Sequence, residues 1–383
     1  MNPIAYRFLE PLDILTLRGN KLFGSAGSYG ESQLPPWPSV AAGALRSRIL
    51  SDDGVDLQQF ARGSQPHESI GTPEQPGSFR LTDFLMAVRR KDGSVEAVYA
   101  KPADMVIYED NGAKKISLLQ PRMMASGIQS SSPCTHLPIL ECAERIKVEG
   151  GYWLTQSGWQ RYLMGEIPLN DQILHQSQLW SLETRVGVGL DASRGAAADG
   201  HLFSSQVIAF MRSYVHQEKS LDVGFLVGAA GCKLPRDGLL RLGGDGRGTA
   251  ITEVSWKPSH PDYEAISAAG RCRLILTTPC LLPKGWNWST DMMFDVGGVK
   301  GTIQAFATGR YDVISGWDMA KGCPKTAERF TPAGSVYWLD QLQGSAADLQ
   351  KLVEEGLWDE RWHNPHRCAE GFNRCQLAPW TTR

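Results

Sequence analysis

The sequence lacks a long hydrophobic run and a surplus of positive charge, and each absence excludes a class of protein. No segment approaches the ~20 consecutive apolar residues that span a bilayer, so we expect neither a transmembrane helix nor a membrane partner. The 383 residues contain 39 Lys and Arg against 41 Asp and Glu, a formal net charge of −2. A free-standing nucleic-acid binder usually carries a basic surplus because it neutralises phosphates. The balance still permits a local basic groove inside an assembly.

A disulfide framework is also absent, since the eight cysteines are scattered without short spacings. In a chain of this size, that pattern predicts reduced thiols in the cytosol. Residues 1–8 show neither the cationic nor the apolar region of a signal peptide, so we expect a cytoplasmic protein. His363, His366, Cys368 and Cys375 are residue types that suit zinc, but their spacing fits no zinc module. We therefore predict no metal site and no cofactor, and leave open whether this group binds zinc.

Strand and helix signals predict an α+β fold with two ferredoxin-like (RRM-like) domains, at residues 1–258 and 268–383. In the first domain we expect a strand at 4–17, a helix at 40–50 capped by Ser39, and a large insertion at about 52–180. Three further strands are expected there, at 202–211, 221–230 and 249–256. In the second domain a helix is expected where Leu349, Leu352, Val353 and Leu357 fall on one face, with Ser345 as its cap and Asp348 at its third position.

The block Arg241-Leu242-Gly243-Gly244-Asp245-Gly246-Arg247-Gly248 is the most informative motif. Glycine permits positive φ and close approach of the backbone, and arginine matches phosphate oxygens with a planar fork. Together they favour a backbone-built seat for a polyanion. The block has no Gly-Lys-Ser/Thr sequence and is not a Walker A loop, so nucleotide hydrolysis is unsupported. A tight β-turn with two solvated arginines remains the alternative.

Three other blocks accompany it along the chain. The first combines Leu12-Asp13-Ile14-Leu15 and Arg18-Gly19 with the run from Pro35 to Arg46, where a helix N-terminus offers free N–H groups to a phosphate. The second is Glu183 to Asp191 followed by Gly200 to Phe203, which we interpret as a loop with Arg185 facing a partner or phosphate. The last is Gly316-Trp317-Asp318, Pro324-Lys325 and Pro332 to Tyr337. Each block also has a purely structural alternative. The first could be a helix start delimited by proline, and in the second Arg185 could form an ion pair with Glu183 or Asp191. The last could be a solvated basic loop around Lys325.

The order and spacing of these four blocks resemble the third subunit of the type III-B CRISPR effector, the Cmr complex, a family of the RAMP superfamily. The resemblance covers nearly all of the chain outside the insertion. It implies a non-catalytic scaffold that holds the 5′ tag of the crRNA and binds both the large polymerase-like subunit and the backbone RAMP subunit. One departure is that RAMP proteins usually carry a glycine-rich loop near the C-terminus, whereas Gly371-Phe372-Asn373-Arg374-Cys375 has a single glycine.

From these patterns we expect RNA contacts from basic side chains, glycine amides, a helix start and one stacking aromatic. The expected residues are Arg18, Trp37, Ser39, Arg46, Arg185, Arg241, Gly243, Gly244, Gly246, Arg247 and Lys325. Phosphate contacts would position the strand, and splayed tag bases would stack on Trp37. No catalytic residue is expected. A metal-independent endoribonuclease acting on CRISPR repeat RNA through one of the scattered histidines is the rival hypothesis, and a subunit that touches only protein is a third.

Overall fold

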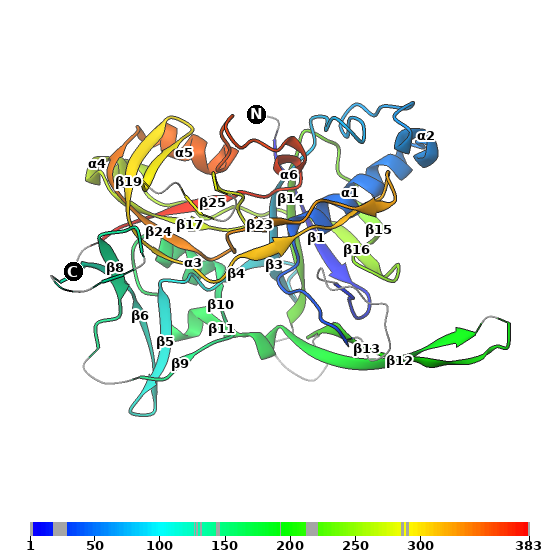
Figure 1. Ribbon diagram of the computed structural model, residues 1–383, viewed down its shortest axis with the longest axis horizontal. Helices are drawn as coiled ribbons and strands as arrows, with labels where there is room; N and C mark the ends of the chain where they lie inside the picture. The colour runs from blue at the N-terminus through cyan, green and yellow to red at the C-terminus, as the bar shows by residue number, and fades with distance from the viewer. Residues whose placement is uncertain are drawn as a thin grey trace. The chain divides into compact units, whose positions relative to one another are not determined.

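The computed structural model describes residues 3–17, 29–125, 127, 129–130, 132–142, 146–191, 193–211, 221–284, 287–288 and 291–381. The chain forms two compact units whose segments alternate along the sequence. Unit 1 contains residues 1–97, 176–256 and 315–326, and unit 2 contains residues 98–175, 257–314 and 327–383. Both contain helices and sheets, which confirms the α+β class (Figure 1). The predicted domain boundaries stay a prediction.

Unit 1 is built on antiparallel strands in the order β3-β14-β1-β16-β15. Their bounds are β1 Ala5–Pro11, β3 Arg80–Arg90, β14 Leu221–Ala230, β15 Asp237–Arg241 and β16 Gly248–Glu253. The interior of β14 is buried on both faces, because it lies between two other strands and its residues are apolar or small. The predicted strand at 4–17 ends early, since Pro11 has no N–H to continue a ladder.

Helix α1 (Pro38–Asp52) joins β1 to β3 and packs against β3 and β15. Its inner side is apolar, with Ala41, Ala42 and Leu45 fully buried. The prediction that Ser39 caps this helix is wrong. Trp37 is the N-cap residue and its side chain makes no capping hydrogen bond, while Pro38 occupies the first turn, where its missing N–H costs nothing. A short helix, α2 (Leu57–Ala61), follows and is capped by Asp56.

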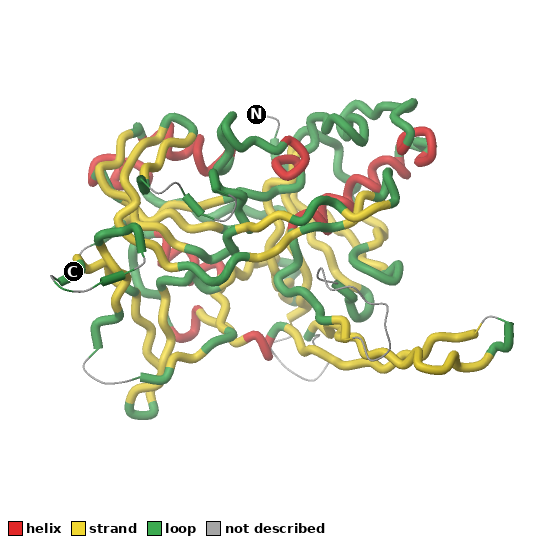
Figure 2. Tube along the Cα trace, viewed as in Figure 1, coloured by secondary structure: helices red, strands yellow, loops and turns green. Residues whose placement is uncertain are grey.

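Strands β12 (Trp180–Asp191) and β13 (Ala196–Phe210) pair as one long hairpin, drawn in yellow in Figure 2, and β2 (Tyr29–Gly30) joins β13 in parallel. Two predictions are corrected here. The segment at 202–211 belongs to this hairpin and not to the sheet around β1, and residues 183–191 form a strand and not a loop. The place expected for 202–211 is taken by β3, which comes from within the predicted insertion.

Unit 2 has a five-stranded antiparallel sheet in the order β18-β19-β24-β17-β25. The bounds are β17 Cys272–Leu276, β18 Met293–Val296, β19 Val299–Ala307, β24 Val336–Gln343 and β25 Cys375–Pro379. Helix α5 (Ala346–Glu355) joins β24 to β25. It begins at a capping box of Ser345 and Asp348 and buries Leu349, Leu352 and Val353, as the sequence predicts. The prediction that Leu357 belongs to the same helix face is wrong, because the helix ends at Glu355 and Gly356 is its C-cap residue.

A fully buried polar network ties distant segments of unit 2 together. Arg273 Nη1 lies 2.8 Å from Asp104 Oδ2, and the Tyr162 hydroxyl donates to Asp104 Oδ1 at 2.7 Å. Arg273 also donates to the carbonyl oxygens of Tyr162 and Pro379, so its guanidinium is surrounded by acceptors. Burial raises the pKa of the Tyr162 hydroxyl well above its usual value, and it therefore remains a donor.

Unit 2 also contains further strands and short helices. Their bounds are β5 Met105–Asp110, β6 Ala113–Leu118, β7 Gln120–Met123, β8 His136–Ile139, β9 Val148–Glu149, β10 Tyr152–Thr155, α3 Gln156–Leu163, β11 Ile173–His175, α4 Tyr263–Ala269, β20 Asp312–Ile314, β23 Glu328–Phe330 and α6 Pro365–Ala369. β4 (Val95–Ala100) crosses the division between the units, and β21 (Trp317–Asp318) and β22 (Cys323–Pro324) belong to unit 1. None of the described helices has the length and hydropathy needed to cross a membrane.

Candidate nucleic-acid interface

The glycine–arginine block forms the turn of the β15–β16 hairpin, with Arg241 and Gly248 paired at its base. Gly243, Asp245 and Gly246 take positive φ values of 79°, 58° and 64°. Three such residues within four positions reverse the chain, and glycine takes this conformation at little cost. The alternative of a tight turn is therefore correct as a description of backbone shape, and the question becomes what the turn contacts.

The turn is docked on the segment that follows β1. The amide of Gly244 donates to the carbonyl oxygen of Thr16 at 2.7 Å, and the Thr16 hydroxyl lies 3.3 Å from Asp245 Oδ2. A Cβ atom at Gly243 would lie 2.8 Å from that same Thr16 oxygen. Close approach is therefore a requirement at this position. The structure thus brings the first and third sequence blocks into contact, although they are more than 200 residues apart.

Charge at the turn is balanced and not purely positive. Arg247 Nη1 lies 3.0 Å from Asp13 Oδ2, and the Arg247 side chain is 33 % exposed while that of Asp13 is 62 % exposed. Arg241 is exposed at the end of β15. Because Asp13 is largely solvated, this ion pair is weak and can exchange for a phosphate at modest cost. The sequence alternative, in which both arginines are solvated, is correct for Arg241 but not for Arg247.

Two backbone amides of the turn remain available as donors. Within the part of the chain that the structure describes, the N–H groups of Gly243 and Gly246 donate no hydrogen bond, and both residues are exposed. Successive amides around left-handed residues form concave surfaces that bind anions. The turn therefore combines two exposed amides with two arginines.

Residues predicted at the start of α1 are less accessible. The Trp37 side chain is only 8 % exposed, so a base could stack on it only after its surroundings opened. Ser39 is half-buried in the first turn of α1. Arg46 is half-buried with its guanidinium carbon 5.3 Å from the centre of the Phe79 ring. Arg18 lies outside the described residues, but the backbone of its neighbour Leu17 accepts a hydrogen bond from Gln33 at 2.7 Å.

Arg185 lies in the middle of β12, opposite Ser205 of β13. Its Nη2 atom is 3.4 Å from Glu183 Oε2, and both side chains are about half exposed. The ion pair considered from sequence is therefore present, at a length and exposure that contribute little stability. The base of this hairpin touches the first block, since Leu15 bridges to Ile208 and the Ser32 hydroxyl donates to the Gln206 carbonyl oxygen at 2.6 Å.

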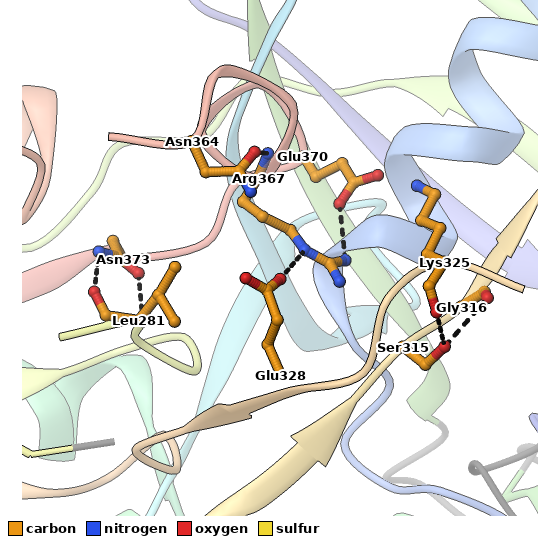
Figure 3. A network of polar contacts seen from close by, with 9 residues as sticks. All are labelled: Leu281, Ser315, Gly316, Lys325, Glu328, Asn364, Arg367, Glu370 and Asn373. Atoms are coloured by element: carbon orange, nitrogen blue, oxygen red, sulfur yellow. Dashed lines mark hydrogen bonds and ion pairs between the residues drawn. The ribbon is translucent and has the colours of Figure 1, made fainter. Parts of the chain in front are cut away.

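Lys325 belongs to a small hairpin of residues 315–326. Its amide donates to the Gly316 carbonyl oxygen at 2.9 Å, and the Ser315 hydroxyl donates to the Lys325 carbonyl oxygen at 2.5 Å. Figure 3 shows the ammonium of Lys325 directed away from Ser315.

Residues 371–375, where the sequence departs from the glycine-rich loop of RAMP proteins, belong to unit 2. Asn373 is fully buried, and its side-chain amide bonds both the N–H and the C=O of Leu281 (Figure 3). Nearby, Arg367 is paired with Glu328 and Glu370. These residues hold loops of unit 2 together and are not available to a ligand.

Among the described residues, the histidines and cysteines do not come together as a metal-binding site. No group of three metal-binding side chains gathers there. Cys375 is buried, and burial raises the pKa of its thiol to about 12, so it is protonated at neutral pH. His67 is held by Asp53 at 2.9 Å and accepts amides of Ser69 and Ile70 on its other ring nitrogen. His216 lies outside the described residues.

Sequence reasoning missed the role of Asp13 and Thr16. Both stand in or beside the first block, but neither residue type carries a local signal for contact with a turn some 230 positions later. It also missed the exposed Trp317, which lies in the last block. A strand-turn-strand pattern around Asp318 and Gly322 would have indicated its hairpin.

The chain was compared with known proteins by sequence and by structure. The model of the family described as "CRISPR-associated protein (Cas_Cmr3)" matches residues 7–380. No curated protein matches the chain. One chain from a cryo-EM structure of type III-B Cmr-beta bound to cognate target RNA is 15% identical, with 97% of this chain and 96% of that chain covered and a TM-score of 0.48. A chain from type III-B Cmr-beta bound to cognate target RNA and AMPPnP is 15% identical, with 91% and 88% covered and a TM-score of 0.44.

The family match spans all four sequence blocks and both units, so it covers the turn at 242–247 together with the segment on which it docks. It agrees with the family resemblance that the order of those blocks indicates. The chain therefore belongs to the Cas_Cmr3 family of CRISPR-associated proteins.

Proposed function

We propose that this chain is a non-catalytic RNA-binding subunit of a type III-B CRISPR (Cmr) effector complex. In that role it holds the 5′ tag of the crRNA and bridges to the large polymerase-like subunit and the backbone RAMP subunit. The observation that carries the proposal is the turn at 242–247, which lies within the family match and presents exposed amides beside two arginines.

The turn suits a sugar–phosphate backbone more than a base edge. Amides of Gly243 and Gly246 can donate to phosphate oxygens, and Arg241 adds a charged fork. Arg247 joins them when phosphate replaces Asp13, its present partner at 3.0 Å. Such contacts position a strand without reading its sequence, which is what a constant tag requires. The near-neutral net charge is consistent with a subunit that shares its RNA with neighbours.

The docking of the turn on Thr16 supplies rigidity. A loop fixed at Gly244 loses little conformational entropy when a ligand binds, so more of the contact energy appears as affinity. The same docking places Gly243 beside Thr16 and Leu17. We propose that Arg241 and Arg247 contact neighbouring phosphates of one strand, while Arg18, which lies outside the described residues, stays a predicted RNA contact.

The two-domain ferredoxin-like arrangement remains part of this proposal. In unit 1, α1 joins β1 to β3 while β14 lies between them, and in unit 2, α5 joins β24 to β25 while β17 lies between them. In each case the inserted strand is antiparallel to both neighbours. This split βαβ arrangement supports a ferredoxin-like origin for both units.

Binding of a 3′-labelled single-stranded RNA of roughly 12 nucleotides to the full-length chain tests the proposal, read by fluorescence anisotropy at several salt concentrations. Arg241→Ala and Arg247→Ala should each weaken binding and lower the slope of log K against log salt by about 0.7. Arg236→Ala is the matched control, because Arg236 is 81 % exposed at the opposite end of β15. Unchanged affinity in both test variants, or cleavage of repeat RNA that one histidine substitution abolishes, would contradict the proposal.

A further inference from the structure

Residues 315–326 form a small, internally fixed hairpin that presents one large aromatic ring. Trp317 pairs with Pro324 and Asp318 with Cys323 across the two short strands. Asp318 Oδ1 accepts the amides of Ala320 at 3.0 Å and Lys321 at 3.1 Å, so the turn is closed by its own side chain.

Backbone hydrogen bonds close both ends of this hairpin. The Gly322 amide donates to the Asp318 carbonyl oxygen at 2.8 Å, and Gly322 takes a positive φ of 62°. At the open end, Lys325 donates to Gly316 at 2.9 Å and accepts from the Ser315 hydroxyl at 2.5 Å (Figure 3). The hairpin is therefore ordered by its own contacts.

Trp317 is 55 % exposed on this hairpin. Every other tryptophan among the described residues is buried or half-buried. An indole left in water forfeits the transfer free energy that burial gives, so its exposure is a cost to the free chain. A ligand that covers the ring accounts for it.

We propose that Trp317 is a stacking platform for an unstacked base of single-stranded RNA, an inference that rests on the proposed RNA-binding function. The charges of the hairpin point to RNA. Lys321 and Lys325 lie at its turn and its open end, while Asp318, its only acid, is occupied by the two turn amides. Cations beside an exposed aromatic ring are the pairing that single-stranded RNA sites use, whereas lysine is depleted in protein–protein interfaces.

The rigidity of the hairpin strengthens this assignment. A ring that is already held in position loses little entropy when a base stacks on it. The exposed Lys321 in the same turn adds a positive charge that can attract a neighbouring phosphate without reading the base. The platform is therefore tolerant of sequence, and base identity would be read elsewhere.

Three variants of the full-length chain test the platform with the same labelled RNA of roughly 12 nucleotides. Trp317→Ala should weaken binding by about 5- to 150-fold, the range that loss of one base–aromatic stack gives, without changing the salt slope. Trp317→Phe should recover part of that loss because a smaller ring still stacks. Met319→Ala is the matched control, since Met319 is 84 % exposed in the same turn and carries no ring system.

The outcomes separate this inference from the proposed function. A wild-type chain that does not bind the RNA overturns both. Weaker binding in Arg247→Ala with unchanged binding in Trp317→Ala leaves the proposed function standing and overturns the platform. Unchanged RNA binding in Trp317→Ala together with loss of co-purifying subunits identifies the hairpin as a protein contact and also overturns it. Circular dichroism of each variant shows whether it folds, which an exposed position should permit.

Discussion

Substitution of Gly243 by alanine tests whether docking of the turn on Thr16 matters for stability. A Cβ atom there would lie 2.8 Å from the Thr16 carbonyl oxygen and 3.0 Å from Leu17 Cδ2, closer than such atoms pack. The residue also has a φ of 79°, which an alanine adopts at a cost of about 1–2 kcal/mol. Relief of the clash adds about 1–3 kcal/mol, so Gly243→Ala should cost about 2–5 kcal/mol of unfolding free energy.

Gly246→Ala provides the matched control within the same turn. Its φ is 64°, but nothing lies within 4 Å of the added Cβ atom. It therefore carries only the backbone cost of about 1–2 kcal/mol. Urea unfolding measures both variants, and hydrogen exchange of the Gly244 amide reports whether its bond to Thr16 survives. Equal stability of the two variants, with the Gly244 amide still protected in Gly243→Ala, would refute the reasoning.

Three further predictions concern other parts of the chain. Asp104→Asn leaves the buried Arg273 guanidinium without its counter-charge and should cost about 3–5 kcal/mol in urea unfolding, whereas a cost under about 1 kcal/mol would show that the pair is unimportant. Hydrogen bonds from the Ser345 hydroxyl and amide lower the pKa of Asp348. The ionised Asp348 carboxylate therefore stabilises the first turn of α5 above about pH 4, and this stabilisation is lost as acid protonates the carboxylate in the folded protein. Exchange of α5 amides across this pH range should therefore accelerate in the wild type and show no such step in Asp348→Asn. Burial raises the pKa of the Cys232 thiol to about 11, so iodoacetamide at pH 8 should alkylate it far more slowly than the exposed Cys323; equal rates measured by mass spectrometry would contradict this.

Local patterns in the sequence predicted part of the local structure, although the Ser39 cap and the loop at 183–191 were wrong. The capping box at Ser345 and the apolar positions 349, 352 and 353 specified α5, because both the cap and the buried face are set within three turns. The tight turn that was considered as an alternative for the glycine–arginine block is present, while the seat for a polyanion stays a prediction. In both cases the residues that determine the structure are sequence neighbours.

Contacts between residues far apart in the sequence could not be predicted from local sequence patterns. The partner of β14 is β3, which precedes it by about 130 residues, and the alternating pattern of 202–211 fits a hairpin as well as it fits a sheet. Likewise, the partner of Arg247 is Asp13, 234 positions away. The burial of Trp37 follows from packing around α1, and a proline-rich context gave no signal for it. Site residues were recognised by type, while their accessibility depended on contacts that only the fold provides.

Recovery of RNA with the tagged chain from its host tests whether this chain holds the 5′ tag of a guide RNA. After ultraviolet crosslinking, the co-purified RNA is sequenced and the crosslinked peptides are identified by mass spectrometry. We expect guide RNAs that share one 5′ tag, crosslinks within residues 241–248, and co-purification of the large polymerase-like subunit. A chain recovered without RNA, or RNA crosslinked only to residues far from that turn, would contradict it.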